Sequence, residues 1–277
     1  MQEKTENWSK ALEGALQAAS LAEQVLLKYW GELKNVSEKL HAGLVSEADK
    51  ESERVIQAYL KKAFPKVEFI GEEGSFENPK SITELPTKGS YWIVDPLDGT
   101  TNYVHQFPIF CTSIGLMVDG DMKCGVIRAP ILKETFSAIR GEGAFYNGKK
   151  MQIGSAQTLH ESLLATGFFA DNEPCLKEQL QIFSTLIREC RGIRRAGAAA
   201  YDLCMVAKGV FDCFWERNLN PWDTAAGVLL VEEAGGVSKT YRGQRYHPFH
   251  NSLIAGNPAV LDQVLKVIQQ NISTDAH

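Results

Sequence analysis

The chain has 277 residues, of which 44% are hydrophobic and 23% charged, and its formal net charge is -5. This length suits one large domain or two small ones, and the composition is that of a globular protein, which excludes a long disordered chain. The acidic balance argues against a protein that binds nucleic acid through a basic face, although it allows a local basic patch around an anionic substrate.

The N-terminal segment, MQEKTENWSKALEG, is polar and mixed in charge, unlike a secretory signal. No run of about 18 apolar residues occurs, so we expect no membrane span. The six cysteines are scattered without a C-x-x-C pair, and several lie in apolar runs. We expect small buried thiols in a reducing cytoplasm, with disulfides or a zinc site as alternatives.

The first part of the chain has the pattern of two long helices. Apolar residues at helical spacing predict the first over 5–31. Ser46, with Asp49 three residues later, predicts the capped start of the second helix, which Pro65 ends. The segment 32–45 between them is expected to be a connector.

Strands and tight turns follow the two helices. The predicted strands are 67–71, 91–102 (which runs into a tight loop), 110–118 and 122–129. Hairpin turns are expected at Asp119-Gly120 and Asn147-Gly148. Residues 75–90 are rich in turn formers and are expected to form a mobile surface loop.

In the second half of the chain, predicted strands alternate with predicted helices. The strands are 163–169, 192–196, 211–216 and 252–256. The helices are 175–190, 198–208, one from Asn220-Pro221 to Gly235-Gly236, and a last one from Asn257-Pro258. This alternation predicts an α/β fold of two subdomains that share one interface, 1–150 and 151–277.

Acidic residues gather where predicted strands end and predicted helices begin. They are Asp49, Glu72, Glu73, Asp95, Asp98 and Asp223. Each also has an ordinary explanation: an acidic turn, a solvated loop, or a partner for the dipole or cap of a helix.

The segment DPLDGTT that begins at Asp95 has the composition of a metal site. An apolar strand brings Asp95 to its end, and Pro96 keeps Asp95 out of the helical conformation. The chain can then turn so that Asp98 and the carbonyl of Leu97 face the same side, while Gly99 allows a ligand to approach closely. Adjacent carboxylates repel each other, and a hard cation such as Mg²⁺ or Mn²⁺ reverses that repulsion.

In combination, the motifs resemble those of the inositol monophosphatase family of Mg²⁺-dependent, lithium-sensitive phosphatases, in particular its bacterial branch. Three match in order and spacing: GEEG at 71–74, WIVDPLDGTTNYVH at 92–105 and PWDTAAGVLLVEEAGG at 221–236. Three shorter matches flank them: LVSEADKESE at 44–53, GAFYNGKKM at 143–151 and RRAGAAAYDLCMVAKG at 194–209. The resemblance covers the chain from about residue 8 to 268 and implies alternating α-β-α-β-α layers, as in fructose-1,6-bisphosphatase.

The resemblance also implies roles for individual residues. Metal ligands are Glu72, Asp95 and the Leu97 carbonyl for a first ion, and Asp95, Asp98 and Asp223 for a second; a third, weaker ion would use Glu72 and water. The groups that orient and deprotonate the attacking water are Thr100 and Asp49, assisted by Glu72. The substrate contacts are Asp98, Gly99, Thr100, Gly197, Ala198, Ala199, Glu216 and Asp223.

Some positions depart from the family pattern or stay open. Many members carry Ser or Thr where this chain has Ala198, so one hydroxyl contact is absent. Lys39 is the nearest match to a lysine of a metal-binding loop in the family, but it is out of register by a few residues. Glu216 has the alternative of a solvated turn carboxylate. Arg194 and Arg195 could contact a second phosphate or a subunit interface, or be solvated.

The resemblance therefore implies a cytoplasmic homodimer that hydrolyses inositol 1-phosphate or a similar polyol or sugar monophosphate with two or three Mg²⁺ ions, or with Mn²⁺. Related substrates are the alternatives: fructose 1,6-bisphosphate, 3′-phosphoadenosine 5′-phosphate, histidinol phosphate or NADP. A different class of function is a non-catalytic partner in a transcription or RNA complex. We expect neither nucleic acid nor a membrane as a partner of the enzyme.

Overall fold

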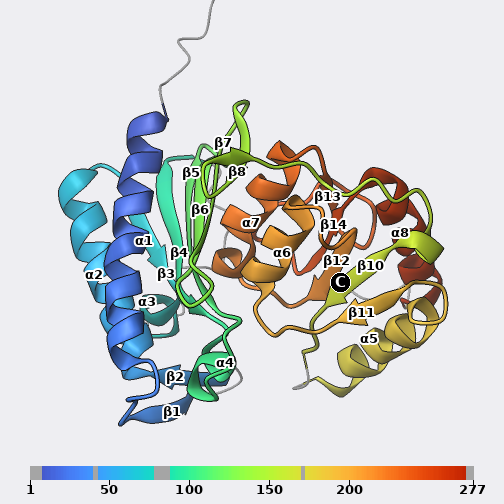
Figure 1. Ribbon diagram of the computed structural model, residues 1–277, viewed down its shortest axis with the longest axis horizontal. Helices are drawn as coiled ribbons and strands as arrows, with labels where there is room; N and C mark the ends of the chain where they lie inside the picture. The colour runs from blue at the N-terminus through green and yellow to red at the C-terminus, as the bar shows by residue number, and fades with distance from the viewer. Residues whose placement is uncertain (1–7, 40–42, 78–87, 170–171, 273–277) are drawn as a thin grey trace, which may run out of the picture.

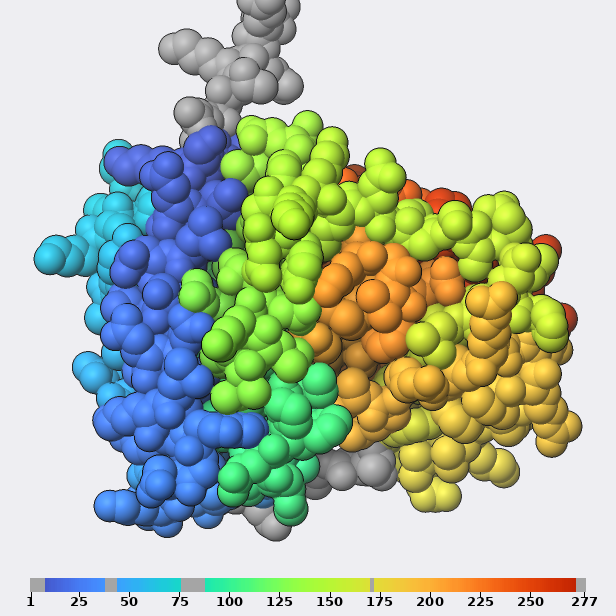
Figure 2. All heavy atoms as spheres, viewed as in Figure 1, coloured from blue at the N-terminus to red at the C-terminus, as the bar shows by residue number. Residues whose placement is uncertain are grey.

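In the computed structural model, which describes residues 8–39, 43–77, 88–169 and 172–272, helices and sheets alternate in five layers (Figure 1). The order is a pair of helices, a sheet, a second pair of helices, a second sheet and a third pair of helices. The expected layered α/β fold is thus confirmed. Figure 2 shows that the residues of the first sheet, in green, touch those of the second half, in orange, along the face in view.

The outer helix pair consists of α1 (Ser9–Tyr29) and α2 (Glu47–Ala63). Helix α1 buries a stripe of small residues, which lets it pack closely on α2 and on the first sheet: Ala11, Ala15, Ala18, Ala19 and Ala22. The predicted cap of α2 is present, because Asp49 Oδ2 accepts a hydrogen bond from the backbone N–H of Ser46 at 2.8 Å. The start of the first predicted helix, at 5–7, lies outside the described residues.

The expected connector between these helices contains two antiparallel strands that the sequence did not predict, β1 (Val36–Lys39) and β2 (Gly43–Ser46). Glu47 stabilises it: its carboxylate accepts hydrogen bonds from Lys34 N at 2.8 Å and Asn35 Nδ2 at 2.9 Å. These contacts join residues 12 and 13 positions apart, so local sequence patterns do not reveal them. Lys39 is the last residue of β1.

The first sheet has seven strands in the order β3-β4-β5-β6-β7-β8-β9. Their bounds are β3 Glu68–Gly71, β4 Ser90–Asp98, β5 Cys111–Val118, β6 Asp121–Ala129, β7 Glu134–Ile139, β8 Gly143–Tyr146 and β9 Lys149–Lys150. Both predicted hairpin turns are confirmed, since the backbone φ angles are +49° and +83° at Asp119 and Gly120 and +46° and +75° at Asn147 and Gly148. These left-handed values are those of the tight hairpin turn that such residue pairs favour.

Between the sheets lie α6 (Ala199–Ala207) and α7 (Pro221–Glu233). Helix α7 is buried along nearly its whole length, and it is accordingly apolar around most of its circumference. Gly125 of β6 lets it pack closely on the first sheet, since a Cβ atom at that position would lie only 3.1 Å from Cα of Ala226.

The second sheet has five strands in the order β11-β10-β12-β14-β13 and is covered by α5 and α8. The bounds are β10 Leu163–Thr166, α5 Glu173–Leu186, β11 Gly192–Arg194, β12 Cys213–Arg217, β13 Val237–Lys239, β14 Ser252–Gly256 and α8 Pro258–Asn271. Two short helices, α3 (Glu72–Glu77) and α4 (Thr100–Val104), and a 3-10 turn at Leu159–Glu161 complete the described elements.

Three smaller expectations can be compared with this fold. The expected loop at 75–90 begins later than predicted, because 75–77 belong to α3, and 78–87 lie outside the described residues. The six cysteines are free thiols, four of them buried. In the described parts of the chain, every helix is too short or too polar to cross a lipid bilayer.

The chain passes from the first sheet to the second between Lys150 and Leu163. One hydrophobic core nevertheless joins residues of both halves, including Phe136 and Phe214. The two subdomains stay a prediction, and we propose that they unfold together.

We therefore expect urea to unfold the protein in one transition, with tryptophan fluorescence and far-UV circular dichroism giving the same midpoint. Replacing the fully buried Leu229 by Ala should lower the free energy of unfolding by about 2–5 kcal/mol and keep one transition, because this residue belongs to the shared core. Two separate transitions would show that the halves are independent.

Candidate active site

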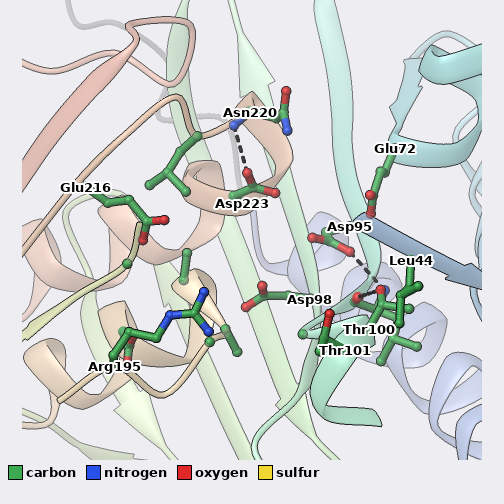
Figure 3. A pocket seen from close by; sticks show the side chains of 18 of the residues that line it. Leu44, Glu72, Asp95, Asp98, Thr100, Thr101, Arg195, Glu216, Asn220 and Asp223 are labelled. Carbon is green, nitrogen blue, oxygen red and sulfur yellow. Dashed lines mark hydrogen bonds between the residues drawn. The ribbon is translucent and has the colours of Figure 1, made fainter. Parts of the chain in front are cut away.

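A pocket of about 230 Å³ lies where the two halves of the chain meet. Figure 3 shows it from close by, with acidic side chains that come from elements far apart in the sequence. The end of β4 and the starts of α3, α4, α6 and α7 surround it. The pocket brings together nearly all of the predicted site residues: Glu72, Asp95, Leu97, Asp98, Gly99, Thr100, Gly197, Ala198, Ala199, Glu216 and Asp223.

A bulge in β4 places two of the acids. Asp95 pairs with Ser113 of β5, and Asp98 pairs with Cys111, so β4 holds one residue more than its partner over this stretch. In a regular strand, residues three apart point to opposite faces, whereas an extra residue brings them to the same face. The tight turn expected after Asp95 is thus a bulge within the strand, with Pro96 in it.

Gly99 directly follows β4, and a larger residue would be strained there. Its φ is +91°, and a Cβ atom would lie 3.1 Å from the carbonyl oxygen of Ile109 and 3.2 Å from Cβ of Ala198. The backbone of β4 therefore comes close to the start of α6. This is the position at which Ala198 replaces the hydroxyl residue of many family members.

The Asp49 and Thr100 side chains meet although they are 51 positions apart. Thr100 Oγ1 donates to Asp49 Oδ1 at 2.9 Å and lies 3.1 Å from the carbonyl oxygen of Leu97. The other Asp49 oxygen accepts from the Ser46 backbone and hydroxyl, so the cap of α2 also holds Asp49 in place. The two residues of the predicted water-orienting pair are thus in contact, and their role stays a prediction.

Backbone N–H groups hold the metal-site acids in place. Asp95 Oδ1 accepts from Leu97 N at 2.9 Å, and Asp223 Oδ2 accepts from Asn220 N at 2.7 Å. Asp98 Oδ2 accepts from Ala200 N at 2.8 Å in the first turn of α6. Part of the helix start that was expected to face the substrate is thus occupied by Asp98.

Glu53 is a positioning residue that sequence reasoning missed. Its carboxylate accepts from Glu73 N at 2.8 Å and from Gly74 N at 2.9 Å, which fixes the start of α3 and with it Glu72. A Cβ atom on Gly71 would collide with the same carboxylate. Glu53 lies in the matched motif LVSEADKESE, which is the signal that could have identified it.

Burial and mutual repulsion make these acids hard to ionise. Burial, with Glu72, Asp98 and Asp223 nearby, raises the pKa of Asp95 well above its usual value. Burial likewise raises the pKa of Asp98 and of Asp223 to about 7. Among the described residues that line the pocket, Arg195 is the only Lys or Arg. The ionised pocket therefore has excess negative charge, which a cation would neutralise.

The donors fit a hard divalent cation by their chemistry. All are oxygen atoms, from the four carboxylates and the Leu97 carbonyl, as Mg²⁺ and Mn²⁺ prefer. Within the described part of the chain, no three His, Cys, Asp or Glu side chains are grouped as ligands of one ion. The acids share one pocket, with Asp95 between Glu72 and Asp98 (Figure 3), and their coordination of metal stays a prediction.

The far end of the pocket contains Glu216 and Arg195 (Figure 3). Asp202 lines the same pocket and repels Glu216 electrostatically. Glu216 lies in β12 and packs over Gly167, where a Cβ atom would collide with its carboxylate. It is therefore part of a strand, and the alternative of a solvated turn carboxylate is wrong. Sequence reasoning missed Asp202, whose signal was a charged residue within the apolar helix segment AAYDLCMVA.

The comparisons with known proteins agree with this geometry. The model of the inositol monophosphatase family matches residues 7–273. The Nus factor SuhB of Pseudomonas aeruginosa is 39% identical over 263 residues, which cover 93% of this chain and 95% of that protein. An inositol-1-monophosphatase of Rhizobium meliloti is 39% identical over 267 residues, covering 95% and 98%.

Solved structures give the same result. The extragenic suppressor protein suhB from Bartonella henselae superposes with a TM-score of 0.85 at 37% identity, covering 95% of this chain and 99% of that one. An IMPase from Thermotoga maritima has a TM-score of 0.84 at 33% identity, covering 94% and 97%. Matched over nearly its whole length in sequence and in fold, this chain belongs to the inositol monophosphatase family.

Proposed function

We propose that this protein, a metal-dependent phosphatase by its family, hydrolyses inositol 1-phosphate or a similar polyol or sugar monophosphate. The observation that carries the proposal is the set of acids in one pocket beside the Asp49–Thr100 pair. Such a set repels a phosphate dianion unless cations are present, and it has little other use in a folded protein.

The predicted ligand sets divide between two ions. Glu72, Asp95 and the Leu97 carbonyl would hold one, and Asp95, Asp98 and Asp223 the other; Glu72 would also contact a weaker third. Mg²⁺ is the proposed metal and Mn²⁺ the alternative. When bound, such ions lower the pKa of a water molecule and stabilise the charge that develops on the phosphate ester.

The chain's own groups would orient the attacking water. Thr100 Oγ1 donates its proton to Asp49, so its oxygen lone pairs can accept a hydrogen bond from a water molecule in the pocket. Asp49 is fully buried and held by the cap of α2, which keeps the pair in one orientation. Proton removal from the water by this pair, with assistance from Glu72, is general base catalysis.

The leaving alcohol would lie between the acids and the far end of the pocket. There, Gly99, Gly197, Ala198 and Ala199 present backbone rather than polar side chains, and Glu216 presents a carboxylate. Hydroxyl groups donate to carboxylates, so Glu216 suits a polyol. A cytoplasmic location and a homodimer, which light scattering would detect, are part of this proposal.

Names of relatives support the enzyme class and one further substrate. Proteins from Thermotoga maritima and Aquifex aeolicus, 34% and 38% identical, are named fructose-1,6-bisphosphatase/inositol-1-monophosphatase. Fructose 1,6-bisphosphate is therefore the first alternative substrate. The esters 3′-phosphoadenosine 5′-phosphate and histidinol phosphate are further ones.

A second candidate function is that of a Nus factor. It is favoured by the names of relatives from Pseudomonas aeruginosa and, as putative Nus factors, Neisseria meningitidis. This role requires a surface for a partner rather than intact acids, so the two functions separate on mutation of the pocket.

We expect inositol 1-phosphate to have the highest kcat/KM in a panel of phosphate esters assayed with Mg²⁺, because the far end of the pocket carries acceptors for hydroxyl groups. The panel contains fructose 1,6-bisphosphate, 3′-phosphoadenosine 5′-phosphate, histidinol phosphate and NADP. Equal or faster turnover of the adenosine bisphosphate would overturn the inositol assignment.

The substitution Asp95→Asn should lower kcat/KM at least about a hundredfold, because it removes a charged ligand that both ions would share. Metal ions stabilise the transition state by several kcal/mol, and each loss of about 1.4 kcal/mol lowers the rate tenfold. The matched control Asp121→Asn, at an exposed aspartate, should retain activity. Should the Asp95 variant still complement a deletion strain while lacking hydrolysis, the Nus-factor role would be the physiological one.

Mg²⁺ should raise the melting temperature more at pH 8 than at pH 5. Asp98 and Asp223 have folded-state pKa values of about 7 against an ordinary 3.8, so the folded metal-free protein binds more protons and loses stability as pH rises from about 4 to 7. Mg²⁺ binds the ionised groups and restores stability, by about 2.7 kcal/mol at a hundredfold excess over Kd. An unchanged melting temperature with saturating Mg²⁺ at pH 8 would contradict the metal site.

A further inference from the structure

Asp202 is a buried acid in the pocket that no role above uses. It lies in α6, is 2% exposed and lines the pocket. Its Oδ1 atom is fully buried and has no hydrogen-bond partner among the described residues. A buried acceptor without a donor destabilises the fold, so its presence in a native structure calls for a ligand or another explanation.

Packing does not provide that explanation. The residues around Asp202 in α6 are apolar and buried, as in the segment AAYDLCMVA. An apolar residue would suit this environment better, since a charge is costly to bury without a partner. Asp202 is thus unfavourable for stability, as residues that bind ligands often are.

The charges around Asp202 do not satisfy it either. Arg195 lies at the same end of the pocket and attracts it, but no ion pair joins the two within 4.0 Å in the described structure. Asp98 and Glu216 are the other charged groups that act on it, and both are acids. Asp202 and Glu216 therefore line the same pocket and repel each other, and Arg195 is among the other residues that line it.

Burial, with other acids nearby, raises the pKa of Asp202 and of Glu216 well above its usual value, so ionisation of these two groups requires a partner that stabilises the charge. When ionised, the two carboxylates only accept hydrogen bonds, and they complement a ligand with neighbouring donors. Adjacent hydroxyl groups of a polyol are such donors. A second phosphate group is itself an anionic acceptor, and it would meet two acids against one arginine. This end of the pocket accordingly favours hydroxyl groups of the leaving alcohol over a second phosphate group.

Building on the proposed function, we infer that Asp202 is a specificity-determining residue that accepts, together with Glu216, hydroxyl groups of the leaving alcohol. The preferred substrates are monophosphates of alcohols with adjacent hydroxyl groups. Asp202 acts on substrate binding and has no part in the attack on phosphorus.

The test compares two esters with rings of the same size, inositol 1-phosphate and cyclohexyl phosphate, the second without free hydroxyl groups. Asp202→Leu removes the acceptors with little change of shape, and Asp202→Asn removes the charge alone. The control is Asp212→Asn, a buried acid outside this pocket whose Oδ2 accepts from Leu163 N. All variants are assayed with Mg²⁺.

We expect Asp202→Leu to raise KM for inositol 1-phosphate roughly tenfold or more, the effect of losing a hydrogen bond to a charged group. The Asn variant should have a smaller effect, and KM for cyclohexyl phosphate should stay within about twofold. The melting temperature of Asp202→Leu should rise, because the unpartnered carboxylate is gone. The control should not change the ratio of the two KM values.

Equal changes for both esters, or no change, would overturn the inference. A lower melting temperature with loss of both activities would also do so, because it would show a structural role. If the wild type hydrolyses neither ester, the proposed function fails, and calorimetric binding of free inositol decides the inference separately. Tighter binding by the wild type than by Asp202→Leu supports it, and equal or absent binding overturns it.

Discussion

Repulsion among buried carboxylates is the constraint on which the rest of this structure depends. Burial and mutual proximity raise the pKa values of Asp95, Asp98 and Asp223, so the pocket resists ionisation without a cation. Ala200, which donates to Asp98, and Trp222, which precedes Asp223, belong to the large core that joins both sheets. The free energy gained by burying this core thus offsets the cost of holding the acids close together.

The backbone reduces this repulsion and at the same time fixes the geometry. Each of these three acids accepts an N–H group from a bulge or a helix start: Leu97 for Asp95, Ala200 for Asp98 and Asn220 for Asp223. Ala200 lies in the first turn of α6, and Asn220 is the N-cap residue of α7; both helices lie between the sheets. A displacement of either helix would therefore alter the pocket directly, which connects the packing of the core to the chemistry of the site.

Small residues allow the elements to come close enough for this arrangement. Gly99 lies against Ala198, Gly125 against Ala226, and Gly167 beneath Glu216. These contacts bring β4 to α6, β6 to α7 and β10 to the Glu216 carboxylate. Asp202, by contrast, does not help the elements to pack, because its Oδ1 atom is buried without a hydrogen-bond partner in the described part of the chain. The role that we infer for it is in binding substrate.

Local patterns in the sequence determined the caps, the hairpin turns and the candidate acids. Ser46 with Asp49 and Asn147 with Gly148 depend on neighbours a few residues away, so their conformations can be predicted. The pairing of β1 with β2, the bulge after Asp95 and the contact of Glu53 with α3 needed the tertiary structure. Each depends on hydrogen bonds between segments that only the folded chain brings together, because pairing partners and burial are properties of the packed molecule.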